Sequence, residues 1–117
     1  MTMMTIGMMS GTSLDAVDAV LVDFSGHGVE VKAVASSPIP QGLKQQLWGL
    51  TQPCHDEIQV MLKAERELSE LYVEVANTLL AKSGIKASQV AAIGAHGQTL
   101  RHQAHGAQTY TLQIIDE

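Results

Sequence analysis

The segment of residues 7–24 constrains the fold of this 117-residue chain more than any other part of it. An apolar stretch runs into a turn of small residues, 10–13, and a second apolar stretch follows. Two carboxylates, Asp15 and Asp18, stand at the entry to that second stretch. The pattern predicts a strand, a tight turn and another strand. Exposed N–H groups, hydroxyls and a carboxylate in such a turn suit a phosphate group and its metal ion.

The composition is typical of a folded domain and excludes several classes of partner. Hydrophobic residues make up 45% of the sequence and charged residues 16%. The net charge is −5 and the basic residues form no run, so we expect neither nucleic acid nor an anionic membrane as a partner. No apolar stretch approaches the roughly 20 residues of a membrane span, and the N-terminus lacks the pattern of a signal peptide. A single cysteine, Cys54, cannot form an internal disulfide, and we therefore expect a cytoplasmic protein.

Three strand patterns follow one another at the start of the chain. They cover residues 5–10, 18–24 and 29–36, with a glycine-rich turn at 25–28. The prolines within residues 38–40 end this run, because proline cannot donate to a strand ladder. The sequence therefore predicts an antiparallel meander of three strands.

Helices are expected next, followed by two more strands. A short helix is predicted over residues 42–50, and a long amphipathic helix runs from a capping box at Asp56 to Gly84. Residues 90–95 form a nearly continuous apolar run, which predicts a strand buried on both faces. The last strand pattern, at residues 110–115, stops so close to the end of the chain that it looks cut.

The turn after the first strand is the first candidate site. Gly11 has no Cβ and would let a phosphate approach the backbone, while Asp15 or Asp18 could hold Mg²⁺ directly or through water. The segment is neither a Walker sequence nor a dinucleotide fingerprint. The alternative is an ordinary turn with solvated aspartates.

The second candidate site follows the apolar run of residues 90–95. His96, Gln98 and Thr99 offer donors and acceptors that suit sugar hydroxyls or an acetamido group. The alternative is a structural histidine in a loop.

Two further groups of polar residues favour plain interpretations. The first, Arg101, His102 and His105, is more simply a solvated loop than a metal or anion site, because no carboxylate or cysteine supports it. The second, Cys54 with His55, is interpreted as inert, because neighbours in sequence rarely face one another as a catalytic pair requires.

Three blocks of the chain together resemble the anhydro-N-acetylmuramic acid kinase family. They are residues 7–15 with residues 17–18, residues 93–99, and residues 111–114 with Asp116, and they occur in the family's order across the whole chain. The prolines before the helices also fit. The resemblance implies an α/β fold of the ribonuclease-H-like or actin-like ATPase class, with a five-stranded mixed sheet that contains the meander. The chain would be the amino-terminal part of the first, phosphate-binding lobe, with the second lobe absent.

The resemblance also implies an activity and a set of contacts. The activity is ATP-dependent, Mg²⁺-assisted opening of 1,6-anhydro-N-acetylmuramate by water, which gives N-acetylmuramate 6-phosphate in cell-wall recycling. The phosphate contacts would come from Gly11, Thr12, Ser13, Leu14, Asp15, Ala16, Val17 and Asp18. The sugar contacts would come from His96, Gln98 and Thr99, and Asp15 or Asp18 would hold Mg²⁺.

The chain departs from the family pattern at two positions. Ala16 and Ile115 stand where the family usually has glycine. If Ala16 had to adopt a positive φ, the cost would be about 1 kcal/mol or more. The β-branched Ile115 would crowd a backbone that approaches a ligand.

The family's general-base aspartate and second lobe belong to a segment after Glu117, so we expect no kinase activity from this chain alone. A rival hypothesis is a noncatalytic nucleotide-binding or sugar-binding module with the same lobe. A third is a fragment that is held together by self-association, such as a homodimer, because an unpaired strand exposes apolar surface.

Overall fold

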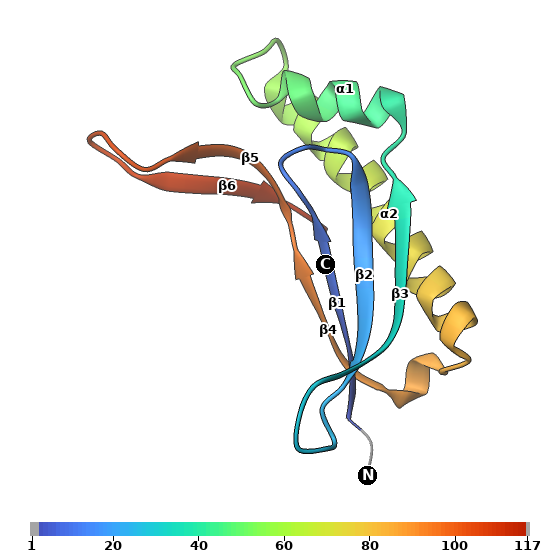
Figure 1. The fold of residues 1–117 in the computed structure, drawn as a ribbon. Coiled ribbons are helices and arrows are strands. Elements are labelled where there is room, and N and C mark those ends of the chain that lie inside the picture. The colour runs from blue at the N-terminus through green and yellow to red at the C-terminus, as the bar shows by residue number, and fades with distance from the viewer. Residues whose placement is uncertain (1–2, 117) are drawn as a thin grey trace.

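A computed structural model describes residues 3–116 as a four-stranded mixed sheet, with helices on one face and a separate two-stranded hairpin (Figure 1). In chain order the elements are β1 (Met4–Ser10), β2 (Ala16–Asp23), β3 (Glu30–Pro38), α1 (Gln41–Gly49), α2 (Glu57–Ser83), the 3-10 turn η1 (Ala87–Gln89), β4 (Val90–His96), β5 (Gln98–Gln103) and β6 (Tyr110–Ile114). The predicted α/β class is therefore confirmed.

The sheet has the strand order β3-β2-β1-β4. The first three strands form the predicted antiparallel meander, and β4 lies parallel to β1 at the far edge. A parallel neighbour needs a long crossover, which α1 and α2 supply. Within residues 3–116 the sheet has four strands, whereas the resemblance implied five.

Helix α2 covers one face of the sheet, mainly across β2 and β3 (Figure 1). Alternate residues of β1 and β2 are buried beneath it, as period-two strands require. The helix ends at Gly84, whose φ of 74° is the left-handed conformation that favours glycine. Although α2 has 27 residues, no helix among those described is long and apolar enough to cross a membrane. The core side chains include Ile6, Leu14, Val17, Leu21, Leu47, Leu68, Val75 and Leu79.

The predicted capping box at the start of α2 is wrong. Asp56 has a left-handed φ of 50°, and its side chain makes no capping hydrogen bond. The carboxylate lies 3.2 Å from His55 Nε2 instead. The Asp56 carbonyl still accepts the N–H of Val60 at 3.1 Å, so the helix begins at the expected place by a different contact.

Strand β4 is not buried on both faces as its apolar sequence predicted. It lies at the sheet edge, most of its residues are exposed, and Ile93 is 58% exposed. The reason is geometric, because α2 packs over β2 and β3 and leaves β4 with β1 as its neighbour in the sheet. The apolar run of β4 therefore forms an exposed face in the described chain.

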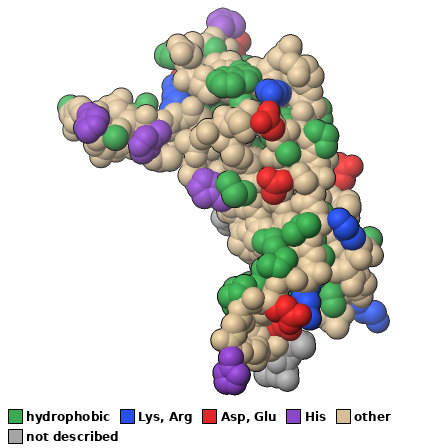
Figure 2. Space-filling model, viewed as in Figure 1, with side chains coloured by type: hydrophobic (Ala, Val, Ile, Leu, Met, Phe, Trp, Pro, Cys, Tyr) green, Lys and Arg blue, Asp and Glu red, His purple; other side chains and the backbone are tan. Residues whose placement is uncertain are grey.

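The segment after β4 forms a hairpin. Strand β6 confirms the strand predicted at residues 110–115, whereas β5 forms where the sequence predicted a loop. Strands β5 and β6 pair antiparallel and project from the sheet as an arm (Figure 1), and Figure 2 shows histidine side chains on this arm. Leu100 and Ile114 join the base of the hairpin to the core. Arg101 holds the same base to the loop before α2 through Leu50 O at 3.0 Å and Gln52 O at 3.0 Å. It also binds the first residue of α2 through Glu57 Oε2 at 2.7 Å.

The contact between Arg101 and Glu57 predicts a pH-sensitive attachment of the hairpin. The Arg101 hydrogen bond, with help from the Cys54 N–H, holds the pKa of Glu57 below its ordinary value of 4.5. A depressed folded-state pKa stabilises the folded form above the unfolded value, and that contribution is lost as the pH falls through the folded pKa. We therefore expect hairpin amides to lose hydrogen-exchange protection by a few-fold below pH 4.5.

The variant Glu57→Gln should show the reduced protection already at neutral pH, with little further change on acidification. The matched control is Glu74→Gln on α2, which removes a carboxylate away from the hairpin. Equal protection of the Leu100 and Leu112 amides in all three proteins at neutral pH would contradict this role of Glu57.

Candidate functional site

The turn between β1 and β2 lies at the end of the sheet near α1 (Figure 1). It is closed by the N–H of Leu14, which donates to Gly11 O at 3.1 Å. Asp15 O accepts the N–H of Ile39 at 2.9 Å, which ties the turn to the chain just before α1. The two residues between Gly11 and Leu14 are exposed. The turn is thus held at its base and open at its tip.

Backbone strain in this turn lies at Leu14 and not at Ala16. Leu14 has a left-handed φ of 57°, a conformation that costs an L-residue about 1 to 2 kcal/mol. Its side chain is only 2% exposed, and burial of a leucine side chain gives about 1.5–3 kcal/mol, which compensates for the strain. Ala16 starts β2 opposite Pro38 without a positive φ, so this departure from the family pattern is harmless in the described structure.

No neighbouring atom in the fold lies close enough to Gly11 to exclude a larger side chain at this position. A Cβ added to it would meet its nearest neighbour, Ser13 Oγ, at an ordinary 3.8 Å, and Gly11 has no positive φ. The folded chain therefore does not itself demand glycine at this position. Close approach of a ligand to the backbone is one physical reason for a residue without a side chain.

Of the residues predicted to contact the phosphates, some have side chains in the core and others have side chains at the surface. Leu14 and Val17 have buried side chains and could offer a ligand only their backbone groups. Asp15 is exposed, and its Oδ1 accepts a hydrogen bond from Lys44 Nζ at 3.2 Å. Lys44 comes from α1 and places a positive charge beside the turn. Sequence reasoning missed it, because no local spacing links a helix lysine to a turn 29 residues earlier.

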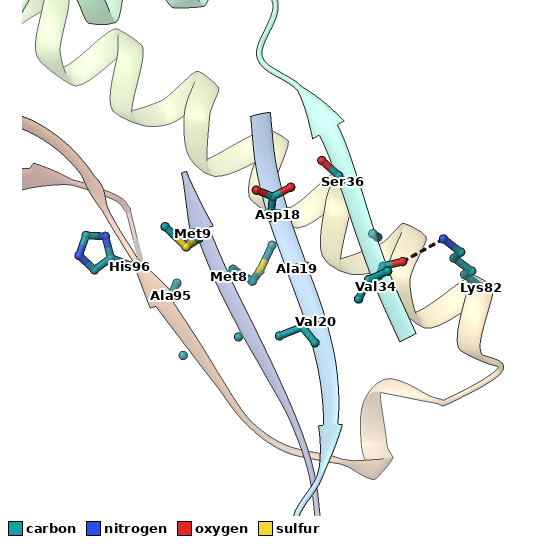
Figure 3. A pocket seen from close by; sticks show the side chains of 13 residues that line it. Met8, Met9, Asp18, Ala19, Val20, Val34, Ser36, Lys82, Ala95 and His96 are labelled. Atoms are coloured by element: carbon teal, nitrogen blue, oxygen red, sulfur yellow. Dashed lines mark hydrogen bonds between the residues drawn. The ribbon is translucent and has the colours of Figure 1, made fainter. Parts of the chain in front are cut away.

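Asp18 lies on the face of the sheet opposite α2, in a row of residues that crosses all four strands (Figure 3). Met9 pairs with Asp18 on one side and with His96 on the other, and Ser36 pairs with Asp18 from β3. Neighbouring strands are about 4.8 Å apart, so the Cα atoms of Asp18 and His96 are about 10 Å apart. The row borders a shallow hollow of about 1030 Å³. One residue of each predicted site, Asp18 and His96, therefore lies on the same face and at the same end of the sheet.

The donor set fits a nucleotide-bound Mg²⁺ better than a dedicated metal centre. Among residues 3–116, no group of three or more His, Cys, Asp and Glu side chains is arranged to hold a metal. A Mg²⁺ ion on a nucleotide takes most of its ligands from phosphates and water and needs one or two carboxylates. Asp18, with an exposed carboxylate, meets that requirement, whereas Asp15 is already paired with Lys44.

Gln113, on β6, joins two of the predicted sugar residues. Its side-chain Nε2 donates to His96 Nε2 at 3.1 Å and to Thr99 Oγ1 at 3.2 Å. The His96 ring nitrogen must therefore accept, which leaves the proton of the neutral ring on Nδ1. His96 and Gln113 are exposed and Thr99 is partly buried, so the cluster has free donors and acceptors at the surface. Gln113 lay in a family block, but no local pattern in the sequence linked it to His96.

Gln98 differs from the other two predicted sugar residues because it is buried. Its side chain is 1% exposed, and its Nε2 donates to Thr99 O at 3.0 Å. Its Oε1 is buried without a hydrogen-bond partner among the described residues. Direct contact of this side chain with a ligand at the surface is not available in this conformation.

Tyr72, on α2, connects the ends of β1 and β4. Its hydroxyl lies 3.0 Å from Ser10 Oγ and 2.8 Å from His96 O. Both Ser10 and Tyr72 are almost completely buried, and burial raises the pKa of the tyrosine. The sequence had identified Tyr72 only as a residue of the apolar helix face.

The cluster of Arg101, His102 and His105 is not the solvated loop that the sequence favoured, because Arg101 and His102 lie on strand β5. Arg101 is occupied by the loop contacts described above, and His102 Nδ1 pairs with Thr111 Oγ1 at 2.7 Å across the hairpin. His105 lies in the exposed loop at the tip of the arm.

Ile115, the second departure from the family pattern, packs against the core. Cys54 is an exposed free cysteine.

Comparisons with known proteins agree on one family. The sequence model for "Anhydro-N-acetylmuramic acid kinase" matches residues 3–117. The chain is 49% identical over 111 residues to the anhydro-N-acetylmuramic acid kinase of Variovorax paradoxus, and the aligned segment covers 93% of the chain and 30% of the relative. It is 46% identical over 111 residues to that of Shewanella amazonensis, which covers 95% of the chain and 30% of the relative. The chain therefore spans about 30% of the length of these relatives.

Close packing at Gly97 gives a test of how the candidate sugar site is built. A Cβ on Gly97 would lie 3.1 Å from Ile114 O and 3.3 Å from Gln113 Cβ. We expect Gly97→Ala to lower the free energy of unfolding by about 1–2 kcal/mol, as is typical of overpacking. Urea denaturation followed by circular dichroism measures this change.

The matched control is Gly94→Ala, in the neighbouring strand, where an added Cβ meets nothing within 4 Å. This variant should be as stable as the unsubstituted chain or slightly more stable, because glycine weakens a strand interior. Equal stability of the two variants would show that the hairpin does not pack on Gly97 as described.

Proposed function

The chain belongs to the anhydro-N-acetylmuramic acid kinase family, and we propose that it supplies the phosphate-binding turn and part of the sugar site of such an enzyme. In the proposed reaction, water adds to C1 of 1,6-anhydro-N-acetylmuramate and the bond from C1 to O6 breaks. The γ-phosphoryl group of ATP passes to O6, ADP leaves, and a base takes the proton from water. The product, N-acetylmuramate 6-phosphate, belongs to cell-wall recycling.

One observation carries this proposal above the others. The parallel pairing of β1 with β4 brings the turn after β1 and the polar cluster after β4 to the same end of the sheet, where both strands finish. Ligands of α/β sheets commonly bind at the carboxyl ends of strands. Phosphoryl transfer depends mainly on the positions of donor and acceptor, so a fold that brings these two segments to one end of the sheet suits it.

The turn would hold the phosphates of ATP. Gly11 leaves room for a phosphate beside the backbone, and the exposed N–H and hydroxyl groups of Thr12 and Ser13 are suitable donors. Asp18 would hold Mg²⁺, which neutralises charge on the phosphates when it is bound. Asp15 would act through Lys44, whose ammonium group could turn from the carboxylate toward a phosphate.

The polar cluster on β4 and the hairpin would contact the sugar. His96 can donate from Nδ1 while Gln113 occupies Nε2, and Thr99 offers a hydroxyl held by the same glutamine. Gln98 would support these residues from within the protein. This arrangement suits hydroxyl and acetamido groups, which both donate and accept hydrogen bonds.

We further propose that residues 3–116 form part of the first lobe of an actin-like ATPase, and that the general base and second lobe come from elsewhere in the complete enzyme. The 117-residue chain alone is then expected to bind Mg²⁺–ATP without turnover. Formation of the sugar phosphate by the isolated chain would contradict this division of labour. A cytoplasmic location stays a prediction.

The role of Gly11 tests the proposed ATP site. Because the fold leaves space for a Cβ there, Gly11→Ala should change the free energy of unfolding by less than about 0.5 kcal/mol. The added methyl group should displace a phosphate from one backbone donor, and the loss of about 1 kcal/mol corresponds to about fivefold weaker binding. Isothermal titration calorimetry with Mg²⁺–ATP measures the affinity.

Gly42→Ala, in α1, is the matched control, because a Cβ there also meets nothing within 4 Å. It should bind ATP as the unsubstituted chain does. If Gly11→Ala binds equally well, or the unsubstituted chain binds no ATP, the turn is not the phosphate site.

A homodimer of the 117-residue chain remains a separate proposal. Ile93 on edge strand β4 is 58% exposed and Val34 on the open face is 56% exposed. Such surfaces favour pairing with a second copy. Light scattering should give a mass that rises with concentration, and Ile93→Lys should reduce the rise. Val29→Lys, at a position that is 64% exposed in a loop, should not; a concentration-independent monomer would contradict the proposal.

A further inference from the structure

The hydrogen bonds of Tyr72 have only one consistent assignment of donors. The carbonyl of His96 can only accept a hydrogen bond, so the Tyr72 hydroxyl donates its single proton to it at 2.8 Å. The Tyr72 oxygen must then accept from the Ser10 hydroxyl at 3.0 Å. The result is a directed chain of two hydrogen bonds from Ser10 through Tyr72 to His96.

These two hydrogen bonds lie where the backbone pairing between β1 and β4 ends, between the two candidate sites. The ladder between β1 and β4 ends at the pair Met9 and His96. One residue later, Ser10 leads directly into the phosphate turn, and His96 leads into the sugar cluster. The Tyr72 hydroxyl therefore joins the two strands at the place where the backbone bonds between them end.

We propose that Tyr72 is a positioning residue that fixes the phosphate turn and the sugar cluster relative to each other. The proposal rests on the proposed kinase function. Tyr72 itself stays 4% exposed on a helix whose neighbouring residues Leu71 and Val75 are in the core, so its hydroxyl has a rigid support. It touches neither substrate in this role and acts through Ser10 and His96.

The expected effect follows from the alignment that phosphoryl transfer needs. A small displacement of the two sites should leave each substrate able to bind but should misalign the γ-phosphate and O6. Loss of Tyr72 should therefore lower kcat and kcat/KM together and leave both KM values nearly unchanged. A purely structural role would lower the apparent kcat only in proportion to the loss of folded enzyme, so kcat is expressed per folded enzyme, with the folded fraction measured by circular dichroism.

The kinetic test uses a chimaera in which residues 3–117 replace the matching segment of the Variovorax paradoxus relative. Tyr72→Phe removes the hydroxyl alone and should lower kcat about tenfold or more, with KM for ATP and for the sugar within twofold. Tyr110→Phe makes the same chemical change at a residue that is 46% exposed and should have no effect. Equal kcat values for the two variants would overturn the role of Tyr72.

Ser10→Ala tests whether the two bonds act as a unit. It should lower kcat in the same direction, and the double variant with Tyr72→Phe should be no slower than Tyr72→Phe alone. Independent, multiplicative effects would contradict a single connected chain of hydrogen bonds.

A second measurement separates failure of this proposal from failure of the proposed function. If the unsubstituted chimaera is folded but makes no sugar phosphate, the kinase function fails. Hydrogen exchange in the 117-residue chain then decides the role of Tyr72. Ser10→Ala should increase exchange at the amides of both Gly11 and Gly97, whereas an increase confined to Gly11 would show that the ends of β1 and β4 are not coupled.

Discussion

The parallel ladder between β1 and β4 is the interaction on which the rest of the structure depends. It joins segments that lie far apart in the sequence, and both helices are needed to carry the chain between them. Once the ladder forms, the turn after β1 and the polar residues after β4 have to lie at the same end of the sheet. The hairpin, the hollow beside Asp18 and the contact of Tyr72 with both strands all follow from that arrangement.

Local patterns predicted most elements because those elements are stabilised by nearby residues. The period-two strands of the meander, the amphipathic face of α2 and the Gly84 stop can each be recognised within a short window. The exposure of β4 could not be recognised in this way, because an apolar run indicates only that a strand can be buried. Which elements cover it depends on where α2 packs. The pairing of β5 with β6 was missed because polar residues around His102 favoured a loop.

The same distinction applies to the candidate site. The turn at Gly11 and the polar segment at His96 were identified from residue type and order, which survive without a structure. The contacts of Lys44, Tyr72 and Gln113 depend on side chains from other elements, so a single sequence carries no direct sign of them. The burial of Gln98 is a further example, since a polar residue between His96 and Thr99 gives no sign in the sequence that its side chain is enclosed.

Leu14 gives the turn a property that a flexible glycine-rich loop lacks. Its left-handed backbone is retained because the side chain is anchored in the core, so the conformation is selected during folding and not by an incoming anion. A preformed loop loses little conformational entropy when it binds, and it discriminates by shape between groups that carry the same charge. The exposed tip can therefore vary in sequence without altering the loop's geometry, whereas a polar residue at the anchor would allow the loop to relax into many shapes.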